Sequence, residues 1–275
     1  MSLGSPLSVR AATRVAAGVA AVGSLAAHER RQRKAMERFA GALLETLLNA
    51  IEANDPDTGM HVRRVASYAV IIAKAADLDE HAQRAVERVG LFHDIGKIHE
   101  ALFDIVHDSQ RLSPAERRAI ATHPARGEQV LAPLAAFYPE LPAGVVAHHE
   151  WWDGTGYPRG LRGRRIPVEA RIVAIADTLD AVAHSRRYRR GTGTREAMEI
   201  VAQGRGTQFD PDLVDLVLFP PVRAELERQQ SLQPRNARHA GRRTHERELI
   251  PDIEFRWRSQ SLGVDGVGGA PRHIK

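Results

Sequence analysis

Apolar residues recur at helical spacing through most of this chain. The first clear stripe lies in residues 35–53, and it consists of Phe39, Leu43, Leu44, Leu47, Leu48 and Ile51. Side chains three and four positions apart share one face of an α-helix, so this stretch is predicted to be an amphipathic helix. The helix is expected to end at Asn54-Asp55-Pro56, because proline disfavours helical geometry in the residue before it.

The same periodicity predicts further helices, over residues 58–76, 82–97, 113 onward, 124–134, 142–149, 168–183, 194–203 and 211–219. Ser113 and Glu116 have the spacing of a capping box, which marks a helix start. Residues 98–112 and 150–166 carry no regular pattern and are predicted loops. Alternating β-branched runs are missing and aromatic residues make up only 5%. The core is therefore predicted to be an all-α domain over residues 35–220.

The two ends differ from this core. Residues 1–34 form an alanine-rich extension, and its segment 11–27 is interrupted by Arg14, Gly18 and Gly23. No run of 18 purely apolar residues occurs, so we expect no membrane span and a cytoplasmic protein. Residues 221–275 form an Arg- and Gly-rich tail that is predicted to be poorly ordered. One apolar-aromatic island in it, Ile250 to Trp257, could dock back onto the domain.

Composition narrows the chemistry. The chain has no cysteine and 13 histidines, so disulfides, thiol nucleophiles, iron–sulfur clusters and cysteine-ligated zinc are excluded. Any metal must be held by imidazole and carboxylate, the donors that suit iron, manganese or zinc. The formal net charge is +5, but residues 222–275 hold 11 basic and 7 acidic residues and so carry +4 of it.

Histidines and aspartates mark a candidate metal site in the helical core. Asp177 stands inside an apolar predicted helix, where a buried charge must be paired or bound to metal. The candidates from the residues alone are His61, His93, Asp94, His123, His148, His149 and Asp177. Each histidine taken singly could also be a hydrogen-bonded core residue.

These residues fall in a recognisable order. His93-Asp94-Ile95-Gly96-Lys97 matches the HD signature, and a second block matches the HHExxDGxGYP pattern: His148-His149-Glu150-Trp151-Trp152-Asp153-Gly154-Thr155-Gly156-Tyr157-Pro158. From about Leu43 to Phe219, the chain resembles the HD-GYP domain, a subgroup of the HD metal-dependent phosphohydrolases.

The resemblance implies an HD-type helical bundle that hydrolyses cyclic di-GMP to pGpG or GMP in bacterial second-messenger signalling. It implies two divalent metal ions, iron or manganese, with Asp94 bridging them. One ion would be completed by His61, His93 and Asp177, and the other by His123, His148 and His149. Asp57 stands where some relatives have a glutamate ligand to a third metal; it could ligate a metal or only favour the positive helix N-terminus.

The resemblance also assigns roles outside the ligands. Asp94 and Lys97 would be catalytic, with Lys97 placing a point charge on a phosphate. Substrate contacts would come from Lys97, Gly156, Tyr157, Pro158, Arg186 and Arg189. The chain departs from the family pattern after Lys97, at Asp108-Ser109-Gln110 and at Arg187, all in predicted loops.

Other readings stay open at this point. A domain with altered loops could bind metal and cyclic di-GMP yet turn over poorly, as a sensor or interaction module, or it could act on another nucleotide. Sensor proteins or diguanylate cyclases are expected as protein partners. Nucleic acid is not expected as a ligand, because acidic residues interrupt the basic tail. The apolar stripe of residues 35–53 could pack in the core or pair in a homodimer.

Overall fold

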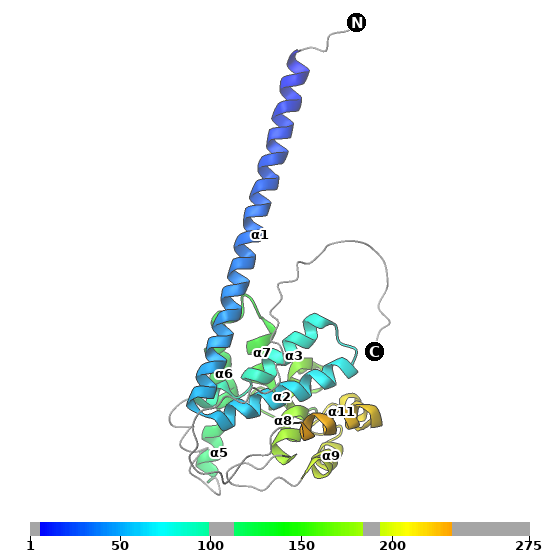
Figure 1. The fold of residues 1–275 in the computed structure, drawn as a ribbon. Coiled ribbons are helices and arrows are strands. Elements are labelled where there is room, and N and C mark those ends of the chain that lie inside the picture. Colours follow the sequence, from blue (N-terminus) through cyan, green and yellow to red (C-terminus); the bar gives the residue numbers. More distant parts are fainter. Residues whose placement is uncertain (1–5, 99–112, 184–192, 233–275) are drawn as a thin grey trace. The chain divides into compact units, whose positions relative to one another are not determined.

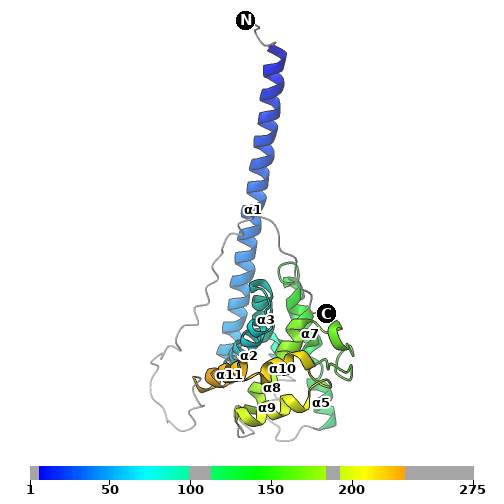
Figure 2. The same ribbon diagram turned by 90° about the vertical axis from the view of Figure 1, so that its right-hand side faces the viewer.

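The computed structural model describes residues 6–98, 113–183 and 193–232, of which 6–25 and 194 are described by their backbone alone. Within these ranges the chain is helical, and its one β contact is an isolated bridge between Arg205 and Phe209. The elements, of which most of the α-helices are labelled in Figure 1 and α10 in Figure 2, are α1 (Pro6–Asn54), α2 (Pro56–Ala75), α3 (Glu80–Phe92), η1 (Ile95–Ile98), α5 (Pro114–Ile120), α6 (His123–Leu131), η2 (Ala132–Leu134), α7 (Glu140–Ala147), η3 (Gly163–Arg165), α8 (Val168–Ala183), α9 (Thr194–Gln203), α10 (Pro211–Leu218) and α11 (Pro220–Ser231). The predicted all-α class is confirmed.

Helix α2 lies at the centre of the core. It packs against α3, α8, the end of α1, α10 and α11, an arrangement that can be followed in Figures 1 and 2. Its buried face includes Val65, Ala69 and Ile72, each with no exposed surface. These positions are four and three residues apart, so the spacing that predicted the helix also describes the face it buries.

The break predicted after α1 is confirmed. Helix α1 ends at Asn54, and Asp55 caps α2 by accepting hydrogen bonds from the Asp57 amide at 3.1 Å and the Thr58 hydroxyl at 2.7 Å. Among the described side chains of α1, those buried in the core come from its last turns: Ala40, Leu44, Leu48 and Ile51. Residues 28–39 of the same helix are exposed.

Three predicted boundaries are wrong. The helix expected over residues 35–53 is the last part of α1, which begins at Pro6. The helix expected over 82–97 ends at Phe92, and residues 95–98 form a separate 3₁₀ turn. The poorly ordered tail is predicted to begin at residue 221, but α11 begins at Pro220, continues to Ser231 and buries Leu226 to 1% exposure. Proline fits the first turn of a helix because the amide it lacks has no helical partner there. The capping box of Ser113 and Glu116 is confirmed at the start of α5.

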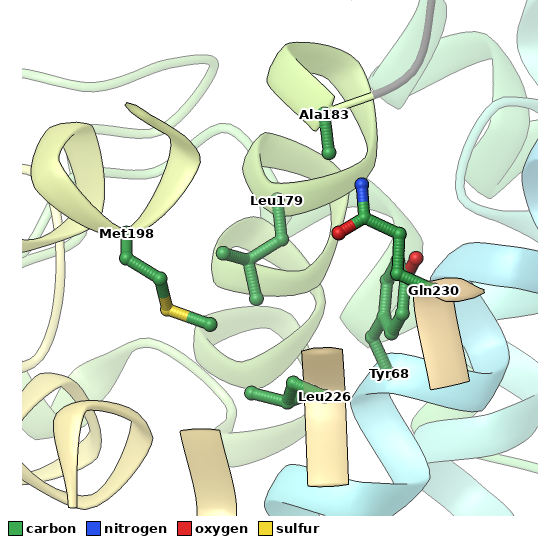
Figure 3. A pocket seen from close by; sticks show the side chains of 6 residues that line it. All are labelled: Tyr68, Leu179, Ala183, Met198, Leu226 and Gln230. Atoms are coloured by element: carbon green, nitrogen blue, oxygen red, sulfur yellow. The ribbon is translucent and has the colours of Figure 1, made fainter. Parts of the chain in front are cut away.

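A small cavity lies between α2, α8, α9 and α11, and no histidine lines it. Figure 3 shows its lining, which consists of Tyr68, Leu179, Ala183, Met198, Leu226 and Gln230. None of these is a candidate ligand. No helix within the described residues is long and apolar enough to cross a membrane.

Candidate metal centre

Several helix ends bring the candidate ligands together. His61 comes from α2, His93 and Asp94 follow α3, and His123 begins α6. His148 and His149 follow α7, and Asp177 lies in α8. Histidines that are far apart in the sequence thus converge because the helices that carry or adjoin them pack against one another. The sequence-predicted set is one cluster in space.

The ligand atoms form two groups. One consists of His61, His93 and Asp177, and the other of His123, His148 and His149; within each group, one candidate ligand atom per residue lies within 4.8 Å of the others. These are the same two triplets that the resemblance implied. Three convergent donors are the number that a metal site typically takes from protein while leaving positions open.

Asp94 lies between the two groups. Its Oδ2 is 3.8 Å from His61 Nε2 and 3.5 Å from His93 Nε2. Its Oδ1 is 3.3 Å from His123 Nε2 and 4.0 Å from His148 Nε2. Each carboxylate oxygen therefore faces a different group, which is the geometry that a bridging ligand needs.

Three of the histidines are held by backbone carbonyls: those of His93 and His148 belong to α3 and α7, the helices they follow, and that of His123 belongs to the end of α5. The Nδ1 atoms of His93, His123 and His148 lie 2.8, 2.7 and 2.6 Å from carbonyl oxygens three residues earlier. A carbonyl only accepts, so each Nδ1 must carry the proton and donate. In the neutral ring, Nε2 then carries no proton and directs its lone pair into the cluster. This is the form in which histidine binds metal.

The positions of these protons show whether a cation would fit between the Nε2 atoms. His123 Nε2 and His148 Nε2 are 3.1 Å apart, and two neutral rings with protonated Nδ1 atoms have no proton to share between them. His93 Nε2 is buried and makes no hydrogen bond within the described part of the chain. Such facing lone pairs are stabilised by a positive ion, so these residues fit a metal centre.

The electrostatics favour the ligand forms of Asp94, His148 and His149. At His93, burial alone would lower the pKa, but the carboxylates of Asp94 and Asp177 outweigh it and raise that pKa. Burial alone would raise the pKa of Asp94, but Lys97 and His93 outweigh it and hold that pKa well below its ordinary value. Burial, reinforced by the imidazoles around it, holds the pKa of His148 well below its ordinary value. Burial together with His123 lowers the pKa of His149 to about 3. At neutral pH the carboxylate is thus ionised and both of these imidazoles are neutral, as metal binding requires.

Asp180 is a site residue that the sequence analysis missed. It is 1% exposed, and its Oδ2 accepts a hydrogen bond from His61 Nδ1 at 2.7 Å. Arg64 holds the same carboxylate with two bonds of 2.5 and 3.0 Å. Carboxylates that bind the far nitrogen of a ligand histidine fix its ring and tautomer. The signal was present, because Asp177 and Asp180 stand three residues apart and share one face of an apolar helix.

The Gly-Tyr-Pro segment folds back onto the metal centre. The Tyr157 amide donates to the His149 carbonyl at 3.1 Å, and the Tyr157 ring stacks on the His149 ring with centroids 5.0 Å apart. Burial and the charges of Asp94 and Asp177 raise the pKa of Tyr157 to about 12. Gly156 lies so close that an added Cβ would be 2.2 Å from the Trp151 nitrogen, so glycine is required there.

The remaining predicted residues lie as follows. Lys97 Nζ is 2.6 Å from Asp94 Oδ2, beside the first group. Pro158 is exposed next to Tyr157. Asp57 is exposed in the first turn of α2 and belongs to neither ligand group. Arg186 and Arg189 lie outside the described residues, as do the altered loop residues 99–112.

Comparison with known proteins bears on this site. The sequence model of the HD domain matches residues 45–213, which is more than half of the chain and includes all seven candidate ligands. The chain belongs to the HD domain family. The two-group centre described above therefore lies within an HD domain.

Several curated proteins resemble this HD domain. A 3′3′-cGAMP-specific phosphodiesterase of Vibrio cholerae is 35% identical over 67% of this chain and 36% of its own length. A cyclic di-GMP phosphodiesterase response regulator of Xanthomonas campestris pv. campestris is 34% identical over 72% of this chain and 50% of its own length. A cyclic di-GMP phosphodiesterase of Thermotoga maritima is 33% identical over 66% of this chain and 50% of its own length. The chain thus spans half or less of these relatives.

Among solved structures, the HD domain of the Listeria monocytogenes phosphodiesterase PgpH is 18% identical, with a TM-score of 0.49 over 67% of this chain and 97% of that chain.

Proposed function

We propose that this HD domain is a metal-dependent phosphodiesterase that hydrolyses a cyclic dinucleotide, with cyclic di-GMP as the first candidate substrate. The observation that carries the proposal is the position of Asp94, whose two oxygens face two separate groups of ligand atoms. Phosphodiester hydrolysis is the chemistry that paired metal sites commonly perform. The names of the similar curated proteins support the same class of substrate.

The proposed ligands are the two triplets, with Asp94 shared between them. Carboxylate and imidazole donors without thiolate suit iron or manganese. When bound, two such ions supply Lewis-acid polarisation of the phosphodiester and lower the pKa of water. A third ion would need Asp57 or another donor beyond the two groups.

Residues of the chain itself prepare this site. Lys97 holds Asp94 ionised and presents an ammonium group at the edge of the first ligand group, where it can donate to a phosphate oxygen. Tyr157 keeps its hydroxyl proton at neutral pH, because its pKa is raised to about 12. Its ring and hydroxyl thus offer the substrate an apolar face and a hydrogen-bonding group beside the metal centre.

A second candidate substrate is 3′3′-cGAMP. It differs from cyclic di-GMP in one purine base, and three of the similar Vibrio cholerae proteins are named as specific for it. The ligands and Lys97 would act on the phosphodiester that both molecules contain. Selection between the two must therefore come from groups that contact the bases.

The test is a product assay on metal-loaded protein. Protein reconstituted with Mn²⁺, or with Fe²⁺ under anaerobic conditions, is incubated with each dinucleotide and the linear dinucleotides and mononucleotides are resolved by chromatography. We expect hydrolysis of at least one substrate, and a loss of at least about 100-fold in Asp94→Asn, which weakens the shared ligand. Asp215→Asn, which changes an exposed surface pair with Arg205, should keep wild-type activity.

Three results would overturn the proposal. Product from neither dinucleotide above the Asp94→Asn level would remove the enzymatic function. Tight binding of cyclic di-GMP without product would instead assign the chain as a sensor module, the alternative that its altered loops suggested. Equal rates on unrelated phosphodiesters would remove the cyclic dinucleotide as the substrate class.

A further inference from the structure

Glu150 is a buried carboxylate next to the metal centre that the proposed reaction does not use. It follows the ligands His148 and His149 directly and is 3% exposed. Burying a carboxylate is costly unless its charge is met by hydrogen bonds or an ion pair. A glutamate in this place therefore points to a specific bonding task.

The carboxylate bonds to the backbone beyond the Gly-Tyr-Pro segment. Its Oε1 accepts a hydrogen bond from the Arg159 amide at 2.6 Å, and its Oε2 accepts one from the Leu161 amide at 2.9 Å. These are the contacts that the carboxylate makes within the described residues, and each oxygen takes one amide. Hydrogen bonds from amides to a charged acceptor are stronger than those to a neutral one.

Tyr157 is thereby held on both sides. On the N-terminal side its own amide donates to the His149 carbonyl at 3.1 Å. On the C-terminal side the chain is fixed two and four residues later by Glu150. Between these two attachments the ring lies on His149, with an interplanar angle of 22°. The loop has no helix or strand of its own to keep it in this position.

We propose that Glu150 is a positioning residue, which holds Tyr157 over the metal centre by accepting the amides of Arg159 and Leu161. The inference rests on the proposed function for its effect on catalysis, but not for the position of the ring. Glu150 belongs to neither ligand group, and its two oxygens are occupied by backbone amides. Its effect should pass through Tyr157.

The chain offers a matched control in the same loop. Arg159 also bonds by its side chain to Glu128 of α6, with Nη2 2.7 and 2.8 Å from the two oxygens. The Arg159 side chain is 51% exposed and that of Glu128 is 33% exposed. Exposed ion pairs of this kind contribute little to stability. Glu128→Gln should therefore change the position of the loop far less than Glu150→Gln does.

The first readout is hydrogen–deuterium exchange of the loop amides. Glutamine has the shape of glutamate but offers one accepting oxygen, so one of the two amides loses its partner. We expect the amides of Arg159 and Leu161 to exchange about tenfold faster in Glu150→Gln, with metal content and helical circular dichroism unchanged. Unchanged exchange in this variant would overturn the proposal.

The second readout separates positioning from general stability. The effect of Glu150→Gln on kcat/KM is measured in the wild type and in a Tyr157→Ala background. We expect a loss of about tenfold in the wild type and less than about twofold in the background, because coupled residues are not additive. A tenfold loss in both would show that Glu150 does not act through Tyr157.

A third readout does not depend on activity, so it can be measured even if neither dinucleotide is hydrolysed and the proposed function fails. In the metal-free protein, stacking by Tyr157 gives the His149 ring protons a ring-current shift in the NMR spectrum. We expect Glu150→Gln to reduce that shift toward the value in Tyr157→Ala, and an unchanged shift would overturn the proposal. If Glu150→Gln reduces the helical signal, Glu150→Asp, which keeps the charge on a shorter arm, is measured in the same ways.

Discussion

The substitution Gly96→Ala tests how closely η1 and α6 must approach for the metal centre to form. A Cβ on residue 96 would lie 2.1 Å from the His123 carbonyl oxygen and 2.7 Å from the Gly127 nitrogen. Both are backbone atoms of α6, so no side chain can rotate out of the way. Real Cβ atoms essentially never approach closer than 3.0 Å. The two segments must therefore separate by about 0.9 Å, the difference between 3.0 and 2.1 Å.

A separation of this size matters because both segments carry ligands. Asp94 stands two residues before Gly96, and His123 is the residue whose carbonyl is pushed. Their ligand atoms are 3.3 Å apart. Metal–ligand distances tolerate about 0.2 Å, so the shift exceeds the tolerance severalfold. The first group, His61, His93 and Asp177, has no member on α6 and should be spared.

If the proposed two-metal centre forms, we therefore expect Gly96→Ala to lose the metal of the second group and to keep the other, so that the bound metal falls from two equivalents toward one. Activity should fall by about 100-fold, the effect of an ångström-scale displacement. Stability should fall by about 1–3 kcal/mol, as in an overpacked core. The measurements are elemental analysis after Mn²⁺ loading and gel filtration, urea unfolding, and the product assay.

Gly206→Ala is the control. An added Cβ there meets no atom within 4 Å, but φ is +75°, so the strain of the left-handed region costs about 1 kcal/mol without moving a ligand. It should keep both metals. Two metals bound with wild-type affinity in Gly96→Ala, with activity retained, would refute the claim that this contact sets the ligand geometry.

Two further predictions concern single side chains. Asp180→Asn removes the carboxylate that holds His61 Nδ1 and Arg64; we expect the metal affinity of the first group to fall about 10–100-fold, while equal losses in both groups, measured by chelator competition, would contradict this. In metal-free protein, His149 has a folded-state pKa of about 3 against about 6.5 when unfolded. The unfolded chain therefore binds more protons between these values, and stability falls as the pH is lowered through this window. His149→Asn should reduce that slope by up to about 1.4 kcal/mol per pH unit in urea unfolding from pH 7 to 4.5, and parallel pH curves for the two proteins would contradict the assignment.

Much of the candidate site could be predicted from the chain because its motifs are local. His93 and Asp94 are adjacent, as are His148 and His149, and helical periodicity places each pair at or near the end of a helix. The resemblance to HD-GYP domains supplied the grouping into two triplets, and the structure forms the same triplets. The roles of Arg186 and Arg189, which lie outside the described residues, stay predictions.

The tertiary structure decided which residues form hydrogen bonds with these ligands and with the segments next to them. Asp180 meets His61 across 119 positions of sequence, and Glu150 turns back to amides that follow Tyr157. The sequence by itself determined which residues can form helices and which can bind metal, because both depend on side-chain type and short spacing. It did not determine which buried carboxylate bonds to which ring or amide, or that α11 closes the core with Leu226. Those choices depend on how the helices pack, and packing is set by contacts between residues distant in the chain.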